Sequence, residues 1–320
     1  MKSPVFGLRQ LTWLVVVCAF TPATASPQTS TPAAKSQTPS KAPASAAKPY
    51  VPPRTPWGDP DIQGIYKNVS MYPLESRERP TVEGQTPAPP SRRVDAGAGP
   101  EHWYEVPMNG TTPMVIDPPD RRVPYKPWAR TLNSEINTHQ GDNPEVKIRR
   151  DYLDHRVRCL PSGAPRVTTP CAYCGYQILQ GPGFVAFFYE WNHLYQYIPL
   201  DRRQHVDANL KLWMGDAVGH WEGNTLVVDV TNLNDKTWVA RGAAIHTSAM
   251  HIVERYTPVD KDTIDYEVRI EDPNVFTSPW TMRFPAFSRY PQGTELYEYA
   301  CAEGNHIDET VFGVGLTGNK

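Results

Sequence analysis

The sequence lacks the features that mark several large classes of protein. Its 32 lysines and arginines nearly balance its 34 acidic residues, so the net charge is −2, and no basic block occurs. It therefore has no positive field for nucleic acid or an anionic membrane. No apolar run reaches the roughly 20 residues of a membrane helix, so we expect no stable membrane span. The GxGxxG, P-loop and GxSxG motifs are missing as well, and we expect no cofactor and no metal.

Helix-forming sequence is also scarce. The chain contains 34 prolines, far above the usual share of about 5%, and proline breaks helix interiors. Only the region from Trp128 to Arg158 is a plausible helical segment, because apolar residues recur there at helical spacing. We expect one or two short helices in that region.

The first 25 residues predict a secretory signal. Lys2 and Arg9 form the charged start, Leu11 to Phe20 form a short apolar core, and small residues follow. Cleavage is expected near Ala25-Ser26, which predicts a periplasmic or secreted protein. Cys18 lies inside the apolar core, so a lipid anchor remains the minor alternative.

Cleavage would remove Cys18, one of five cysteines, and leave four. An even number in an exported protein favours disulfides. The economical pairing is Cys159 with Cys301 and Cys171 with Cys174, although four cysteines allow three pairings. The Cys171-x-x-Cys174 spacing also fits a redox pair or half of a zinc site, but a structural clip is favoured because no second CxxC accompanies it.

Composition divides the mature chain into a tether and one domain. Residues 26–53 are Pro, Ala, Ser, Thr and Lys with little to bury, which predicts disorder. Residues 54–320 form a single β domain. Within it we expect irregular wrapping segments and a first strand over 54–174, a hairpin meander over 175–301, and a tail over 302–320.

The second half of the chain alternates strands with turn residues. The clearest hairpin joins residues 213–221 to residues 225–231 through Glu222-Gly223-Asn224, a connector suited to positive φ. Counting Ile62–Tyr66 and Glu295–Cys301, we expect about ten strands. The predicted fold is all-β, an antiparallel meander forming a lipocalin-like barrel or a sandwich.

Several segments carry a family resemblance. The segments are WEGNTLVVDVTNLNDKTW, RTPWGDPDIQGIY, CLPSGAPR, HTSAMHIVERY, EDPNVFTSPW and YEYAC. They resemble a family of secreted bacterial proteins, and the resemblance covers most of the chain from Arg54 to Cys301. It implies export but supplies no reaction. Separately, Gly64-x-Tyr66 is similar to the opening strand of lipocalin-type barrels, where glycine lets the strand bend and the ring closes the barrel end.

The strand patterns place the carboxylate of Glu254 among apolar side chains. Residues 264–270 alternate apolar and charged side chains, which predicts one face in the core and one in water. On the preceding strand Glu254 shares a face with Ile252 and Tyr256. If that face is inward, the carboxylate must be paired or its pKa must rise. The structural alternative is that Glu254 forms an ion pair with an arginine such as Arg166 or Arg269.

Four side chains are candidate catalytic groups, namely Asp216, Asp229, His246 and Glu254. They lie in or next to neighbouring strands, so they are expected to converge at one barrel mouth as acid/base groups or hard-metal ligands. The structural alternative is that Asp229 and His246 satisfy backbone amides at strand ends. Structural ion pairs perturb carboxylates as well, so this alternative is the more frequent one.

Aromatic residues suggest a ligand pocket. Candidate ligand-binding residues are Tyr189, Trp213, Trp221, Tyr256 and Tyr266. Aromatic walls with a few polar groups are typical of pockets for flat apolar compounds, and also of a large β core. Between the two tryptophans, Gly215, Ala217 and Gly219 either leave volume in the interior or let a crossing strand approach closely.

These observations support three hypotheses. The first is an exported barrel that binds a small apolar or aromatic compound and transforms it by cofactor-free lyase- or hydrolase-type acid/base chemistry. In it, Glu254 or Asp229 takes a proton, His246 returns it and a tyrosine orients the ligand. The second is a non-catalytic envelope carrier or assembly protein, which a barrel filled by side chains would favour. The third is a hard-metal-dependent hydrolase.

Overall fold

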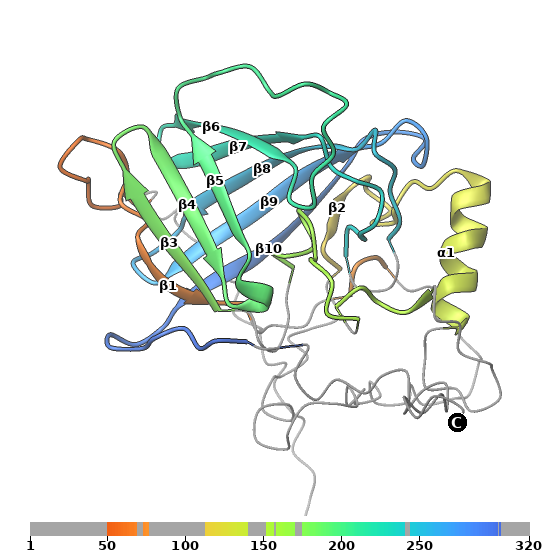
Figure 1. Ribbon diagram of the computed structural model, residues 1–320, viewed down its shortest axis with the longest axis horizontal. Coiled ribbons are helices and arrows are strands. Elements are labelled where there is room, and N and C mark those ends of the chain that lie inside the picture. The colour runs from red at the N-terminus through yellow and green to blue at the C-terminus, as the bar shows by residue number, and fades with distance from the viewer. Residues whose placement is uncertain are drawn as a thin grey trace, which may run out of the picture. The chain divides into compact units, whose positions relative to one another are not determined.

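A single antiparallel sheet dominates the protein (Figure 1). The computed structural model describes residues 50–68, 73–76, 113–139, 152–156, 158–169, 175–240, 244–299 and Cys301. The strands are β1 (Gly64–Lys67), β2 (Val115–Asp117), β3 (Gly175–Gly181), β4 (Phe184–Tyr189), β5 (Tyr195–Pro199), β6 (Asp216–Glu222), β7 (Thr225–Thr231), β8 (His251–Pro258), β9 (Thr263–Glu271) and β10 (Trp280–Arg289). The predicted signal, most of the predicted tether, and Cys171 and Cys174 lie outside the described residues.

The strands follow the order β5-β4-β3-β1-β10-β9-β8-β7-β6, with β2 paired to β10. Every neighbouring pair is antiparallel. The sheet curls until β5 approaches β6, which gives a nearly closed barrel (Figure 1). The all-β prediction is confirmed, and the shape is a barrel, not a sandwich.

The barrel closes through side-chain contact at Gly219 of β6. A Cβ atom at this glycine would lie 2.6 Å from Cγ2 of Ile198 and 3.0 Å from Cδ2 of Leu200. Leu200 directly follows β5, so the end of β5 packs against the bare backbone of β6. The small residues predicted around position 217 therefore serve close strand approach.

Strict alternation fixes the inner and outer faces of β8 and β9. In β9, Ile264, Tyr266, Val268 and Ile270 are buried, while the residues between them are partly or fully exposed. In β8 every second residue from Ile252 is buried as well. The predicted faces are confirmed, because a strand's side chains point alternately to opposite sides.

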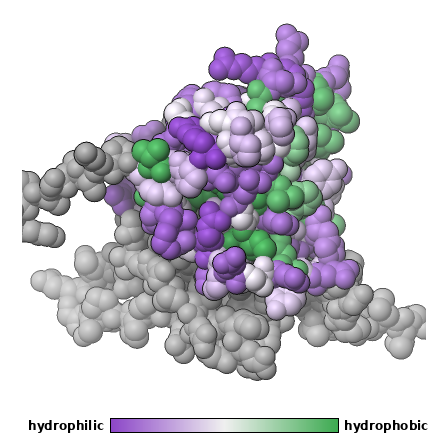
Figure 2. Space-filling model, turned by 90° about the vertical axis from the view of Figure 1, so that its left-hand side faces the viewer, coloured by the Kyte–Doolittle hydropathy of each residue, from purple (hydrophilic) through white to green (hydrophobic). Residues whose placement is uncertain are grey.

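The aromatic run of β4 and β5 is divided between the two faces. Phe187 and Tyr189 are buried inside, whereas Phe188, Tyr195 and Tyr197 are exposed outside. Figure 2 looks at the left-hand side of Figure 1 and shows hydrophobic surface in several patches among hydrophilic residues. Only part of this aromatic run is therefore available to an interior site.

One short helix forms in the predicted region 128–158, of which residues 140–151 and 157 lie outside the described residues. α1 (Pro127–His139) begins at a proline, which is tolerated at the first helical position, and buries Ala129, Asn133 and Ile136. A short 3₁₀ turn, η2 (Trp191–His193), joins β4 to β5. Within the described part of the chain no helix is long and apolar enough to span a membrane.

A disulfide ties the end of the described chain to its middle. Cys159 and Cys301 are bonded, with Cα atoms 5.5 Å apart, as the economical pairing predicted. The predicted strand over Glu295–Cys301 is wrong, because residues 295–299 have no strand partner. Instead Tyr299 packs on Trp191, with ring centroids 4.8 Å apart, so this segment crosses to the disulfide as irregular chain.

Arg289 locks β1 to the end of β10. Its Nη1 donates to the carbonyl of Gln63 at 2.7 Å, and its Nη2 donates to the hydroxyl of Tyr66 at 2.6 Å. The guanidinium carbon also lies 4.7 Å from the centre of the Tyr66 ring. Gly64 has a φ of +148°, and a Cβ atom there would overlap Nη1 of Arg289. Only glycine leaves room for this arrangement.

Gly64→Ala is therefore expected to lower the free energy of unfolding by about 2 kcal/mol or more, from backbone strain and displacement of Arg289. Gly58→Ala is the matched control, since Gly58 has a φ of +97° but open space where its Cβ would lie. Urea denaturation of both variants tests the difference. Equal losses for the two glycines would contradict a specific role for the Arg289 contact.

Candidate functional site

Two predicted catalytic residues meet on the outer face of the barrel. Asp216 begins β6 and Asp229 lies in β7, where it pairs in register with Val218 and Val253. Those positions face outward, opposite to the inward Val228 and Glu254. The chain between β5 and β6 folds back over this face and brings His205 between the two aspartates.

Both ring nitrogens of His205 contact carboxylates. Nδ1 lies 2.9 Å from Oδ2 of Asp216, and Nε2 lies 2.9 Å from Oδ1 of Asp229. A ring N–H that points at a carboxylate oxygen donates a hydrogen bond to it. His205 therefore bridges Asp216 at the start of β6 and Asp229 in β7.

Asp216 is the anchor of this arrangement. Arg203 contacts both of its oxygens, at 2.9 and 2.6 Å, and the backbone N–H of Val206 donates to Oδ2 at 3.1 Å. Burial raises the pKa of Asp216, but the bonds from Arg203 and His205 outweigh it and lower the pKa to about 2. Asp216 therefore stays ionised and holds His205 in place.

The same segment is fastened at a second point. Nδ2 of Asn232, just after β7, donates to the carbonyls of Asp207 at 2.7 Å and Leu210 at 2.9 Å. Asn232 has a φ of +60°, a conformation that asparagine adopts more readily than most residues. Two attachments thus position His205 over the sheet.

His251 forms a dyad with Asp229. Its Nε2 lies 3.1 Å from each oxygen of Asp229, and the two residues project from the neighbouring strands β8 and β7. The hydrogen bond from His251 lowers the pKa of Asp229, and His205 adds to the effect. Nδ1 of His251 has no hydrogen-bond partner among the described residues. The side chains of His251 and Asp229 are 36% and 44% exposed, so solvent and solutes reach them.

Glu254 lies on the opposite face of the sheet, inside the barrel. It is fully buried, and the hydroxyl of Tyr266 donates to its Oε1 at 2.7 Å. Burial raises the pKa of Glu254 to about 7, although Tyr266, Tyr256 and Gln196 each favour the carboxylate. The expected arginine partner is wrong, because Arg166 pairs with Asp154 and Arg269 pairs with Glu271.

Aromatic rings pack against one another around Glu254. Ring centroids are 4.9 Å apart for Phe187 and Tyr256, and 5.1 Å apart for Tyr256 and Tyr266. Tyr189 donates to Oε1 of Gln196 at 3.2 Å. Three predicted ligand-binding residues, Tyr189, Tyr256 and Tyr266, therefore do gather around Glu254, but as packed core side chains.

The two predicted ligand-binding tryptophans lie elsewhere. Trp221 is half-buried in β6 and packs on the core, while its Nε1 has no hydrogen-bond partner within the described ranges. Trp213 precedes β6, and Nζ of Lys236 lies 5.9 Å from the centre of its ring. Neither residue touches the His205 cluster in the contacts that the structure shows.

His246 is buried away from both sites. Its Nε2 lies 2.8 Å from Oγ1 of Thr237, and its Nδ1 lies 3.0 Å from the carbonyl of Thr247. Burial lowers its pKa, which favours the neutral ring. The structure thus brings Asp216 and Asp229 together but leaves Glu254 and His246 apart. In the part of the chain that the structure describes, no group of three or more His, Cys, Asp or Glu side chains is placed to hold a metal ion.

Sequence reasoning missed His205 and Arg203, which lie in an irregular segment without periodicity. It also missed His251 as a partner of Asp229. A usable signal existed, because both residues occupy the outward positions of strands expected to be neighbours. Comparison with family models, curated proteins and solved structures finds no match to this chain. The fold and site define a β-barrel protein with a half-exposed histidine–aspartate cluster on its wall.

Proposed function

We propose that this chain is an exported β-barrel protein that performs cofactor-free acid/base chemistry on a small, mainly apolar compound at His251 and Asp229. The observation that carries the proposal is the convergence of His205 and His251 on Asp229, at 2.9 and 3.1 Å, in a solvent-accessible position. The Cys159–Cys301 disulfide is compatible with export.

Under this proposal each residue has a distinct role. Asp229 accepts a hydrogen bond from Nε2–H of His251, which leaves Nδ1 as the ring nitrogen with a free lone pair. Nδ1 takes a proton from the substrate, or from the water that attacks it, and returns it to the leaving group. Asp229 stabilises the imidazolium formed in between. His205, held by Asp216, contacts Oδ1 of Asp229 and keeps that carboxylate in position beside His251.

Access favours this site over Glu254. Glu254 is fully buried among tyrosines, so a substrate would have to displace packed rings to reach it. Beside the outer cluster, Val206 and Leu210 are 37% and 51% exposed, which offers apolar surface to a substrate. A small compound with an apolar or aromatic body fits these surroundings better than a highly charged one.

His251→Gln is expected to reduce turnover by at least about 100-fold, the lower range for loss of a general acid/base. The assay follows hydrolysis of chromogenic aryl esters, together with solvent-deuterium exchange into small carbonyl compounds, which reports proton abstraction without hydrolysis. Asp229→Asn is expected to cause a loss of the same order, because the dyad acts as a unit.

His220→Gln is the matched control. His220 lies on β6, and its Nε2 contacts Glu222 at 3.1 Å instead of the cluster. This variant should retain full turnover. If the wild-type protein turns over these probes and His251→Gln does so equally well, the dyad is not the catalytic site.

A second candidate function is a non-catalytic envelope carrier or assembly protein. The packing of rings around Glu254 supports it, because closely packed rings are typical of a core that stabilises the fold. Under this alternative the wild-type protein has no turnover with either class of probe. The outer cluster would then only fasten the segment between β5 and β6.

A further inference from the structure

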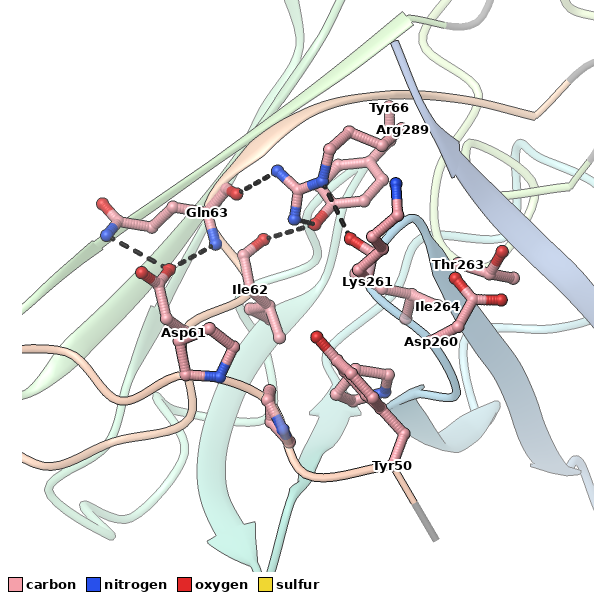
Figure 3. A pocket seen from close by; sticks show the side chains of 13 residues that line it. Tyr50, Asp61, Ile62, Gln63, Tyr66, Asp260, Lys261, Thr263, Ile264 and Arg289 are labelled. Carbon is pink, nitrogen blue, oxygen red and sulfur yellow. Dashed lines mark hydrogen bonds between the residues drawn. The ribbon is translucent and has the colours of Figure 1, made fainter. Parts of the chain in front are cut away.

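A pocket opens at the end of the barrel where β1, β10 and the β8–β9 turn meet (Figure 3). Its volume is about 210 Å³. Pockets for drug-sized ligands span about 300–1,000 Å³, so a smaller molecule is the appropriate occupant. The pocket shares no lining residue with the His205 cluster, and its occupant is independent of the function proposed above.

One wall carries a cation without an acidic partner. The guanidinium of Arg289 donates to the carbonyls of Gln63 and Lys261 and to the hydroxyl of Tyr66. Burial raises the pKa of Tyr66 to about 12, so that hydroxyl stays neutral. Among the described residues no carboxylate lies within ion-pair distance of Arg289. Its charge is therefore balanced only by dipoles, and an anionic group in the pocket would be stabilised.

Two carboxylates on other walls of the pocket, those of Asp61 and Asp260, can each accept a further hydrogen bond. Oδ1 of Asp61 accepts from the backbone N–H of Gln63 at 3.0 Å, and Oδ1 of Asp260 accepts from that of Asp262 at 2.7 Å. The Oδ2 atom of each has no hydrogen-bond partner in the described part of the chain. Lys261 does not neutralise them fully, because its ammonium pairs with Asp262. These oxygens suit a positively charged donor.

Between the charged groups the lining is apolar. Pro52, Pro53, Ile62, Pro258 and Ile264 contribute to it. Figure 3 shows the side chain of Tyr50 reaching toward the middle of the pocket. A ligand here meets a cation, two carboxylates and a hydrocarbon surface within one small volume.

We propose that this pocket binds a small zwitterion of the free α-amino-acid class with an apolar side chain. The carboxylate faces Arg289, the ammonium group faces one of the two aspartates that flank the pocket on opposite sides (Figure 3), and the side chain packs on the prolines. A simple carboxylic acid would satisfy Arg289 but leave both aspartates unmatched, and a simple amine would leave Arg289 unmatched. Only a molecule carrying both charges complements Arg289 and a carboxylate of the lining at once.

Isothermal titration of the full chain with L-leucine tests the proposal. Asp61→Asn combined with Asp260→Asn is expected to raise the Kd at least about tenfold. Arg289 is left unchanged in this test because it also joins β1 to β10. Asp207→Asn is the matched control, since Oδ1 of Asp207 accepts a turn N–H at 2.8 Å in the same way but far from the pocket lining. That variant should bind leucine as the wild-type protein does.

Two leucine derivatives separate the contributions of the charges. N-acetyl-L-leucine lacks the ammonium group and L-leucinamide lacks the carboxylate, and each should bind at least about tenfold more weakly than leucine. The proposal is overturned if leucine shows no binding at about 10 mM, which would place its Kd above the millimolar range. It is equally overturned if the wild-type protein binds either derivative as tightly as leucine, or if the double variant binds leucine as tightly as the wild-type protein does.

Discussion

Replacing Cys159 and Cys301 by serine is expected to lower the free energy of unfolding by about 5 kcal/mol. The bond joins residues 142 positions apart, and cross-linking so long a loop removes much of the conformational freedom of the unfolded chain. It also holds the irregular segment after β10, where Tyr299 packs on Trp191. A loss of this size is a large fraction of the total stability of an ordinary domain.

Urea denaturation with and without reductant measures this effect. Reductant should lower the stability of the wild-type protein by nearly as much as the double serine variant does. In the variant, reductant should add little, because a Cys171–Cys174 bridge would close only a very short loop. A wild-type stability that does not respond to full reduction would contradict a stabilising role for the long bridge.

Glu254→Gln is expected to change the pH dependence of stability by about 3 kcal/mol. The pKa of Glu254 is raised from 4.5 to about 7 by burial, so the folded state binds this proton more tightly than the unfolded chain does. Its contribution is complete below pH 4.5 and is lost as the pH rises to 7. Glutamine has no ionisable proton, so the variant does not lose this contribution to stability as the pH rises.

The comparison must be made as a difference between variant and wild type. Burial lowers the pKa of His155 to about 3 and also lowers that of His246, and both effects weaken the fold as the pH falls. These contributions are common to the two proteins and cancel. Unfolding free energies at pH 4.5, 6 and 8 should shift in favour of Glu254→Gln as the pH rises. A difference that stays constant would show that folding does not raise the pKa of Glu254.

Most of the fold was predictable because short-range sequence patterns determine where strands form, which way they face and where they turn. Alternation of buried and exposed residues identifies the inward faces of β8 and β9, and a Gly-Asn connector identifies the β6–β7 hairpin. The segment over Glu295–Tyr299 shows the limit of such patterns. It has strand-like composition, but the bond at Cys301 draws it toward Cys159, and this tertiary restraint overrides local preference.

The site was predictable only in part. Asp216 and Asp229 were candidates because they lie in predicted strands that are neighbours in the chain. Their partner His205 comes from a segment with no period, so its position depends on how that segment folds back over the sheet. Glu254 was predicted to be buried, but its bond to Tyr266 depends on the β8–β9 register, which individual strand patterns do not determine.

The absence of backbone pairing between β5 and β6 gives the barrel wall a weakest line. Along the other junctions of the ring, amide-to-carbonyl bonds must break before two strands separate. At this junction side-chain contacts hold the strands together, among them those of Ile198 and Leu200 with the surface of Gly219. We therefore expect transient widening of the wall to begin here, and to admit water toward the tyrosine-lined carboxyl group while the hydrogen-bonded strands stay joined.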